Sequence, residues 1–252
     1  MMISARRAVV PGPYTTTIEE YTIGDPAAGQ ILVATEASGI SPGTELAIYT
    51  EIHQWLKDPN NLWAKYPFKP GYSAVGHVIA VGSGVSRFKE GDRVIWPGRH
   101  ESHTLIDANS PEQNVWPIAA HVSAAAAAQL SLARFPLTAL AQSRSLLGQS
   151  VAVLGLGQIG QITTRLFSAV GAFPVIGVDP VPGRRARAET TYGIRTVDPS
   201  AGDSLAALRE LLGGERPDIV VDATGSPPAL QEALRLVADG GRLTARLREA
   251  LA

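Results

Sequence analysis

The residues whose spacing points most directly to chemistry are the glycines Gly155, Gly157 and Gly160 in the stretch Val-Leu-Gly-Leu-Gly-Gln-Ile-Gly. In a G-x-G-x-x-G turn, the first glycine makes a tight turn and the second lets phosphates approach the backbone. The third lets a helix and a strand pack closely. The following helix N-terminus is positive and suits a dinucleotide pyrophosphate. The alternative is a glycine turn that serves packing alone.

A carboxylate at the end of the next apolar run strengthens the nucleotide hypothesis. Asp179 follows Val175–Val178 and lies 19 residues beyond Gly160. This is close to the roughly 20-residue spacing at which an acid hydrogen-bonds the adenosine ribose. An acid here favours NAD over NADP, because it repels a 2′-phosphate. Arg184 and Arg185 are alternative partners for that phosphate, or are solvated at the start of a helix.

The elements that position these residues alternate between strand and helix. The sequence predicts strands at 151–154, 175–179, 194–197, 219–222 and 242–245, and helices at 159–170, 184–192, 204–212 and 228–237. Short β-branched runs separated by amphipathic helices are typical of a doubly wound parallel sheet, the Rossmann arrangement, here assigned to residues 149–252.

Residues 1–122 are rich in strand patterns and punctuated by Gly and Pro. The predicted strands are 8–10, 15–21, 30–37, 74–81 and the end of 88–95, and a short helix is predicted at 51–59. The neighbouring aromatic residues Trp55, Trp63, Tyr66 and Phe68 either line a pocket for a flat substrate or form a satellite hydrophobic cluster under a loop.

A helical junction is predicted at residues 123–148, between the two domains. Ser123 or a nearby residue is the expected N-cap of an alanine-rich helix. Pro136 is expected to interrupt this helix, and a second helical piece is expected at 137–146 before Gly148.

Composition excludes several classes of protein. The 252 residues are 45% hydrophobic and 18% charged, with a formal net charge of −1 and no cysteine. Disulfides, thiolate metal sites and a cysteine nucleophile are therefore excluded. The near-zero net charge gives no indication of binding to nucleic acid or to an acidic membrane. The first seven residues lack the apolar core of a signal peptide, and the alanine-rich stretch falls short of a membrane span. We expect a cytoplasmic protein.

Four further motifs carry a family resemblance. They are Gly39-Ile-Ser-Pro-Gly-Thr-Glu45, Pro70-Gly-Tyr-Ser-Ala-Val-Gly76, Gly91-Asp-Arg-Val94 and Asp222-Ala-Thr-Gly225. With the glycine turn, in this order, the chain resembles the medium-chain dehydrogenase/reductase superfamily of alcohol dehydrogenase-like proteins. The Ser-x-Gly-Thr-Glu form is most similar to zinc-free members, among them bacteriochlorophyllide dehydrogenase-like proteins. The resemblance implies a GroES-like catalytic domain, a nicotinamide cofactor and hydride transfer in a cleft between the domains.

The places of the family's zinc ligands hold unsuitable residues. Where zinc-dependent relatives have Cys-Gly-Thr-Asp and Gly-His-Glu, this chain has Pro42-Gly-Thr-Glu45 and Gly71-Tyr72-Ser73, and the third ligand would fall near Arg134. The family's four-cysteine lobe is also missing. We therefore expect no zinc. His100 and His103 point in different directions in a strand or turn, which disfavours a shared metal. Either could act as a proton donor, and His77 is expected to be a core or edge histidine.

Without a metal, hydrogen-bond donors must stabilise the substrate oxygen. By position, Thr44 matches the family's relay hydroxyl and Tyr72 replaces a ligand, so both are the candidate catalytic residues; alternatively Thr44 caps a turn and Tyr72 packs. The candidate cofactor-binding residues are Gly155, Gly157, Gln158, Ile159, Gly160, Asp179, Arg184 and Thr224.

After residue 245 the sequence departs from the family into a helix-prone, polar tail. We expect the sixth strand of the Rossmann sheet and the returning catalytic segment to be absent, which leaves a sheet edge for a homodimer or protein partner. Two function classes follow. One is a zinc-independent NAD(P)-dependent oxidoreductase acting on an alcohol, ketone or activated alkene in a biosynthetic pathway. The other is a shortened relative without redox turnover that serves as a nucleotide-binding or scaffold protein, or performs non-redox chemistry.

Overall fold

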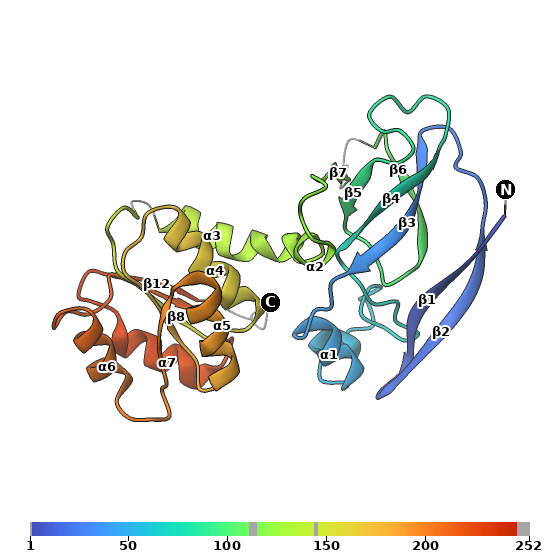
Figure 1. Ribbon diagram of the computed structural model, residues 1–252. Coiled ribbons are helices and arrows are strands. Elements are labelled where there is room, and N and C mark those ends of the chain that lie inside the picture. Colours follow the sequence, from blue (N-terminus) through green and yellow to red (C-terminus); the bar gives the residue numbers. More distant parts are fainter. Residues whose placement is uncertain (1, 111–114, 144–145, 246–252) are drawn as a thin grey trace. The chain divides into compact units, whose positions relative to one another are not determined.

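A computed structural model describes residues 2–110, 115–143 and 146–245 (Figure 1). The chain divides into two compact units, Met1–Ser131 and Leu132–Ala252. This division falls inside the helical segment 123–148 that the sequence analysis set apart. The predicted polar tail, residues 246–252, lies outside the described residues.

The first unit is built from antiparallel strands, as expected for a GroES-like domain. Its strands are β1 (Ile3–Gly12), β2 (Thr15–Ile23), β3 (Gln30–Ser38), β4 (Ala74–Val81), β5 (Arg93–Trp96), β6 (His103–Asp107) and β7 (Trp116–Pro117). Strands β1 and β2 pair with each other, and the described part of the main sheet has the order β6-β3-β4-β5-β7. Its core contains Ile31, Val33, Val78 and Trp96, which alternate along their strands toward one face.

The short helix predicted at 51–59 is present in part, as the single 3₁₀ turn η1 (Gln54–Lys57). Helix α1 (Thr44–Tyr49), which precedes it, was not predicted. Glu51 has φ +61°, a left-handed conformation that a helix does not contain, and it separates the two pieces.

The junction has three short helices: α2 (Ala124–Ala127), the 3₁₀ helix η2 (Leu130–Ala133) and α3 (Arg134–Gln142). Ser123 caps α2, as predicted, by accepting a hydrogen bond from Ala126 N. The expected interruption at Pro136 is wrong. Pro136 lies in the first turn of α3, where a backbone N–H has no partner within the helix, so proline is tolerated there.

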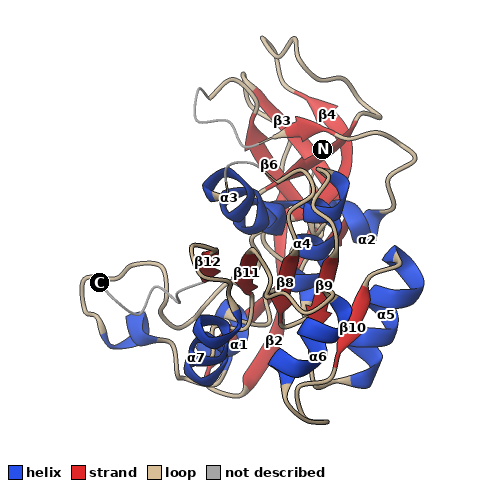
Figure 2. Ribbon diagram, turned by 90° about the vertical axis from the view of Figure 1, so that its left-hand side faces the viewer, coloured by secondary structure: helices blue, strands red, loops and turns tan. Residues whose placement is uncertain are grey.

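The second unit is a doubly wound parallel sheet, as predicted. Its strands are β8 (Val151–Leu154), β9 (Val175–Val178), β10 (Arg195–Val197), β11 (Ile219–Asp222) and β12 (Arg242–Ala245). Its longer helices are α4 (Gln158–Ala169), α5 (Pro182–Tyr192), α6 (Ser204–Leu211) and α7 (Pro227–Leu236). Figure 2 shows the described strands side by side in the order β10-β9-β8-β11-β12.

Both faces of this sheet are covered, which explains why the inner strands β8, β9 and β11 are buried along their whole length. Helices α3, α4 and α5 contribute Ala139, Phe167 and Ala188 to the cluster on one face. Helices α6 and α7 contribute Leu208 and Leu236 to the cluster on the other face. The packed helices thereby fix the carboxyl end of β8, where the glycine turn begins.

Within the described residues, none of the helices has both the length and the apolar character required to cross a lipid bilayer.

Candidate functional site

The glycine turn connects β8 to α4, as the motif predicts. Gly155 has φ +85°, which requires glycine, and its N–H donates to the carbonyl of Val178 at 2.7 Å. A Cβ on Gly160 would lie 1.7 Å from the carbonyl oxygen of Gly155, so only glycine lets the helix pack this closely on the turn. The structure thus gives packing reasons for the first and third glycines.

The second glycine has no such reason. Gly157 has φ −68° and ψ −167°, which any residue adopts, and a Cβ there would meet no protein atom within 4 Å. Gly157 is also the N-cap of α4, whose first turn has no acidic residue and receives no side-chain cap. The turn therefore combines open space beside a bare backbone with the positive end of a twelve-residue helix. This combination fits a pyrophosphate.

Asp179 lies directly under the glycine turn. The residue is 1% exposed, and its Oδ2 accepts a hydrogen bond from Leu156 N at 2.7 Å. Its Oδ1 accepts from Val181 N, also at 2.7 Å, and Arg184 Nη1 lies 3.4 Å from Oδ2. Asp179 therefore anchors the glycine turn to the end of β9. Its predicted contact with the ribose stays a prediction.

Four other predicted cofactor residues lie around the turn. The methyl group of Thr224 would contact a Cβ on Gly155, and its hydroxyl donates to Asp222 Oδ1 at 2.6 Å. The side chain of Arg184 is 54% exposed and projects from α5, whereas Arg185 is held by an ion pair with Asp198. Gln158 and Ile159 begin α4, with Gln158 exposed and Ile159 buried against the sheet.

The other candidate residues lie in the first unit, around Glu45. Thr44 begins α1, and its N–H donates to Ser41 Oγ at 3.2 Å. The hydroxyl oxygen of Tyr72 is buried. Glu45 connects the two segments, because its Oε2 accepts from Ser41 N at 3.1 Å and its Oε1 accepts from Gly71 N at 2.9 Å. The structure thus brings the segments that carry Thr44 and Tyr72 to one carboxylate.

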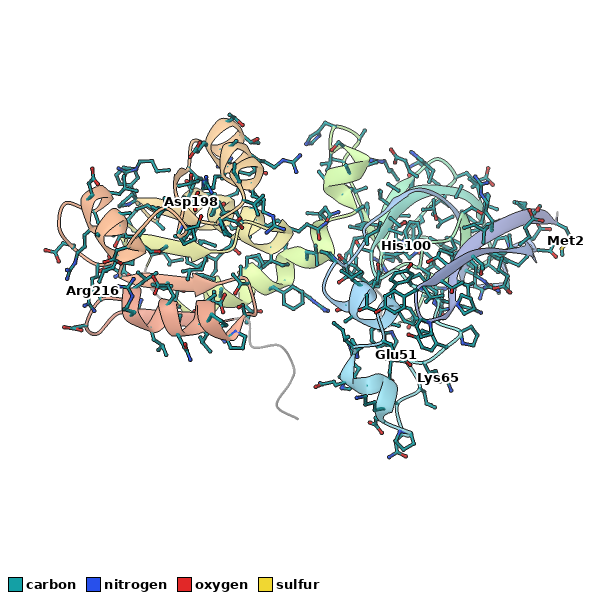
Figure 3. The ribbon with its side chains drawn as sticks, turned by 90° about the horizontal axis from the view of Figure 1, so that it is seen from below. Met2, Glu51, Lys65, His100, Asp198 and Arg216 are labelled. Carbon is teal, nitrogen blue, oxygen red and sulfur yellow. The ribbon has the colours of Figure 1, made fainter. Side chains whose placement is uncertain are left out.

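His100, which Figure 3 labels, adds a third segment to this cluster. Its Nε2 lies 3.2 Å from Glu45 Oε2, and its Nδ1 lies 2.8 Å from Ser38 Oγ. Gly71 has φ +111°, and a Cβ there would lie 2.4 Å from Arg99 Cα and from His100 N. Close packing therefore fixes the segment of Tyr72 against the segment of His100.

The residues in the places of the family's zinc ligands do not fit a zinc ion. Pro42 has no side-chain ligand atom, Tyr72 offers only a buried phenol, and the Arg134 guanidinium is a cation that lies over the Phe135 ring. No group of three His, Cys, Asp or Glu side chains in the described ranges is arranged to hold a metal.

The remaining histidines are separate from this cluster. His103 Nδ1 lies 3.0 Å from Ser102 Oγ. The expectation that His77 is a core or edge residue is wrong: it lies on the inner strand β4, half-exposed, with Nε2 3.6 Å from Glu36.

The aromatic residues near the 3₁₀ turn contact each other edge to face. The ring centroids of Trp55 and Trp63 are 5.8 Å apart, and those of Trp63 and Phe68 are 5.5 Å apart. Phe68 also packs against the buried residues Val10 and Ile48. This packing favours the satellite cluster over a pocket for a flat substrate.

Two family models match most of this chain. Residues 27–124 match the alcohol dehydrogenase GroES-like domain, and residues 159–245 match the zinc-binding dehydrogenase model. The chain belongs to the medium-chain dehydrogenase/reductase superfamily. The order of its two units, one GroES-like and one Rossmann-like, is that of this superfamily.

Individual relatives agree with this assignment. An L-threonine 3-dehydrogenase of Caldanaerobacter subterraneus subsp. tengcongensis is 28% identical over 85% of this chain and 67% of its own length. The 2R,3R-butanediol dehydrogenase of Bacillus subtilis has a TM-score of 0.80 and 23% identity, covering 96% of this chain and 77% of its own. A Sinorhizobium meliloti 1021 protein, described as a zinc-binding dehydrogenase and crystallised with NADP, has a TM-score of 0.80 and 22% identity over 96% and 76%.

The relatives support an oxidoreductase in this medium-chain dehydrogenase/reductase scaffold. Sequence reasoning named the glycine turn, Thr44 and Tyr72, whose functional roles stay predictions, and it weighed His100 only as a lone proton donor. It did not predict that Ser38 and Glu45 contact His100. The signal for Glu45 was the acid of the Gly-Thr-Glu motif, but its partners come from segments 26 and 55 residues away in the sequence.

Proposed function

We propose that this medium-chain dehydrogenase/reductase is a zinc-independent, NAD-dependent oxidoreductase. It transfers hydride between the nicotinamide and a small alcohol, ketone or activated alkene, in a biosynthetic pathway. The observation that carries the proposal is the open backbone at Gly157, which neither conformation nor protein packing explains. A bound pyrophosphate explains it.

When bound, NAD would accept or donate the hydride. The residues of this chain would bind the cofactor and orient the substrate. Gly155, Gly157 and the first turn of α4 bind the pyrophosphate, with Thr224 beside them. In the first unit, Thr44 and Tyr72 hydrogen-bond the substrate oxygen, which takes the place of Lewis-acid polarisation in zinc-dependent enzymes. Glu45 holds both of their segments in place.

The choice between NAD and NADP depends on Asp179 and Arg184. Asp179 presents negative charge at the end of β9, which disfavours a 2′-phosphate. Arg184 is the exposed cation that could favour one. The supporting experiment titrates NADH and NADPH by cofactor fluorescence with the wild-type protein and R184A. We expect the wild-type protein to bind NADH more tightly than NADPH. In R184A, the affinity for NADPH should fall more than the affinity for NADH. If neither cofactor bound detectably, the cofactor proposal would be refuted.

Redox activity needs a separate assay. L-Threonine, 2R,3R-butanediol and a panel of secondary alcohols, ketones and enones are tested at the nicotinamide absorbance with each cofactor. Turnover of one of them is expected. Binding of NADH without turnover of any would favour the alternative class, a nucleotide-binding relative without redox activity.

We further propose that β12, which lies at the edge of the described part of the sheet, pairs with a second copy of the chain or with another protein, because an unpaired edge invites association. Sedimentation equilibrium tests the homodimer.

A further inference from the structure

Ser38, His100 and Glu45 form a continuous chain of hydrogen bonds in the first unit. We propose that this chain is a proton relay, in which Ser38 meets the substrate hydroxyl, His100 accepts the proton and Glu45 orients His100. The inference rests on the proposed oxidoreductase function and assigns it a proton path that neither Thr44 nor Tyr72 provides.

The three residues come from three segments of the first unit, and His100 lies far from the other two in the sequence. Ser38 ends β3, Glu45 lies in the first turn of α1, and His100 lies between β5 and β6. The backbone of His100 is held on both sides: its N–H donates to Pro70 O at 2.9 Å, and its carbonyl accepts from Ala8 N at 2.9 Å. The imidazole therefore has a defined place between the carboxylate and the hydroxyl.

The bonds of Glu45 determine which ring nitrogen of His100 carries the hydrogen. Backbone N–H groups can only donate, and both oxygens of Glu45 already accept from them. A carboxylate that acts as an acceptor requires a donor at His100 Nε2. In the neutral imidazole, Nδ1 is then an acceptor, and Ser38 Oγ at 2.8 Å is its donor.

This arrangement has the order of groups that activates a hydroxyl: a hydroxyl bonded to an imidazole, and the imidazole oriented by a carboxylate. The side chains of His100 and Glu45 are only 16% and 10% exposed, so water competes little for either. Ser38 is half-buried at the end of the relay.

The proton balance of alcohol oxidation follows directly. The C–H bond of the alcohol breaks, and its hydride reduces the nicotinamide. The O–H bond of the alcohol breaks, and its proton passes to Ser38 Oγ as the hydroxyl proton of Ser38 passes to His100 Nδ1. The product is a carbonyl compound, and an imidazolium remains beside the Glu45 carboxylate. Carbonyl reduction uses the same path in reverse.

The first test needs neither cofactor nor substrate. Long-range ¹⁵N–¹H spectra of ¹⁵N-histidine-labelled protein at alkaline pH report the tautomer of each neutral imidazole. The relay requires His100 to carry its hydrogen on Nε2 in the wild-type protein and in S38A, and to lose this preference in E45Q. Hydrogen on Nδ1 of wild-type His100 would overturn the relay, because Ser38 could not then donate to it.

The second test is turnover with whichever alcohol of the screen is oxidised. We expect S38A and H100Q each to lower kcat about 10²-fold or more, with little change in KM or in NADH affinity. S38T should recover part of the loss. The matched control is H77Q, because His77 is half-exposed on β4 and its ring lies beside Glu36, outside the relay.

The outcomes separate the relay from the proposed function. Turnover in the wild-type protein with unchanged kcat in S38A overturns the relay and leaves the oxidoreductase intact. A wild-type protein that turns over none of the screened compounds overturns the oxidoreductase and the relay's role in it, whatever the tautomer of His100.

Discussion

Gly157 and Gly160 belong to one turn, but the protein requires them for different reasons. Gly160 is needed by the protein itself, because a side chain there would meet the backbone of Gly155. Gly157 faces open space, so a side chain at this position would be excluded only by a bound ligand. Substitution of each by alanine separates folding from binding.

For G160A, we expect a loss of about 1–3 kcal/mol in the free energy of unfolding, because backbone atoms must move to admit the methyl group. For G157A, the stability should stay within about 0.5 kcal/mol of wild type, because reduced chain entropy and a poorer N-cap oppose each other. NADH affinity should nevertheless fall in G157A. Urea unfolding and NADH fluorescence measure the two effects. Full NADH affinity in G157A would contradict a pyrophosphate at this glycine.

Thr44 and Tyr72 are tested through turnover. T44A and Y72F each remove one hydroxyl, and we expect each to reduce kcat sharply if it hydrogen-bonds the substrate oxygen in the transition state. Steady-state kinetics with an active alcohol or ketone gives the measurement. Y49F is a suitable control, because the Tyr49 hydroxyl donates to Tyr14 O at the surface. Unchanged kcat in both variants would leave Thr44 as a turn residue and Tyr72 as a packing residue.

At the scale of elements, helix α6 begins at a charged N-cap residue. Asp203 is its N-cap and accepts from Leu205 N at 3.0 Å, and Arg235 Nη2 of α7 lies 2.7 Å from the same oxygen. The hydrogen bond from Arg235 lowers the pKa of Asp203, and the bond from Leu205 N adds to this. The carboxylate therefore ties the N-terminus of α6 to α7.

The sign of the pH effect follows from the lowered pKa. The contribution of Asp203 to stability is fully present above its unfolded pKa, near 3.9. It is lost as the pH falls through the lower folded value. We expect D203N to have a lower Tm than wild type at pH 7 and the difference to shrink toward pH 3. Thermal unfolding across this range is the measurement, with E210Q as a charge-matched control on α6. A Tm difference that is constant with pH would exclude the charge as its source.

Sequence patterns predicted the bounds of some elements more accurately than those of others, for physical reasons. The bounds of β4, β8, β11 and β12 match the predictions. For β8 and β11 the reason is that fully buried strands have short apolar runs ended by turn residues. Helix α1 was not predicted, because its position depends on the contact of Glu45 with a distant segment and on the left-handed Glu51 that ends it. The same limit applies to the site. The glycine turn is local in sequence, whereas the Ser38–His100–Glu45 chain exists only after distant segments meet.

At the scale of the whole molecule, each unit has its own core. Phe167 is fully buried in the second unit, and Val33 is fully buried in the first. All the tryptophans, Trp55, Trp63, Trp96 and Trp116, lie in the first unit. Tryptophan emission therefore reports on the unfolding of the first unit, and far-UV circular dichroism reports on both.

Core substitutions should therefore act on different signals. We expect F167A to cost the second unit about 3–5 kcal/mol, shifting the circular dichroism transition in urea more than the tryptophan transition. V33A should shift the tryptophan transition directly. If F167A shifted both transitions equally, the two units would unfold as a single cooperative block.

Because all the tryptophans lie in the first unit, they can serve as intrinsic energy-transfer donors. The proposed nucleotide site, at the glycine turn, belongs to the unit without tryptophan. Tryptophan emission overlaps the absorption of reduced nicotinamide, so bound NADH would act as an energy acceptor for donors in the other unit. Transfer efficiency would then rise when the units draw together and fall when they separate. Without any added dye, one fluorescence titration would follow both cofactor binding and domain movement.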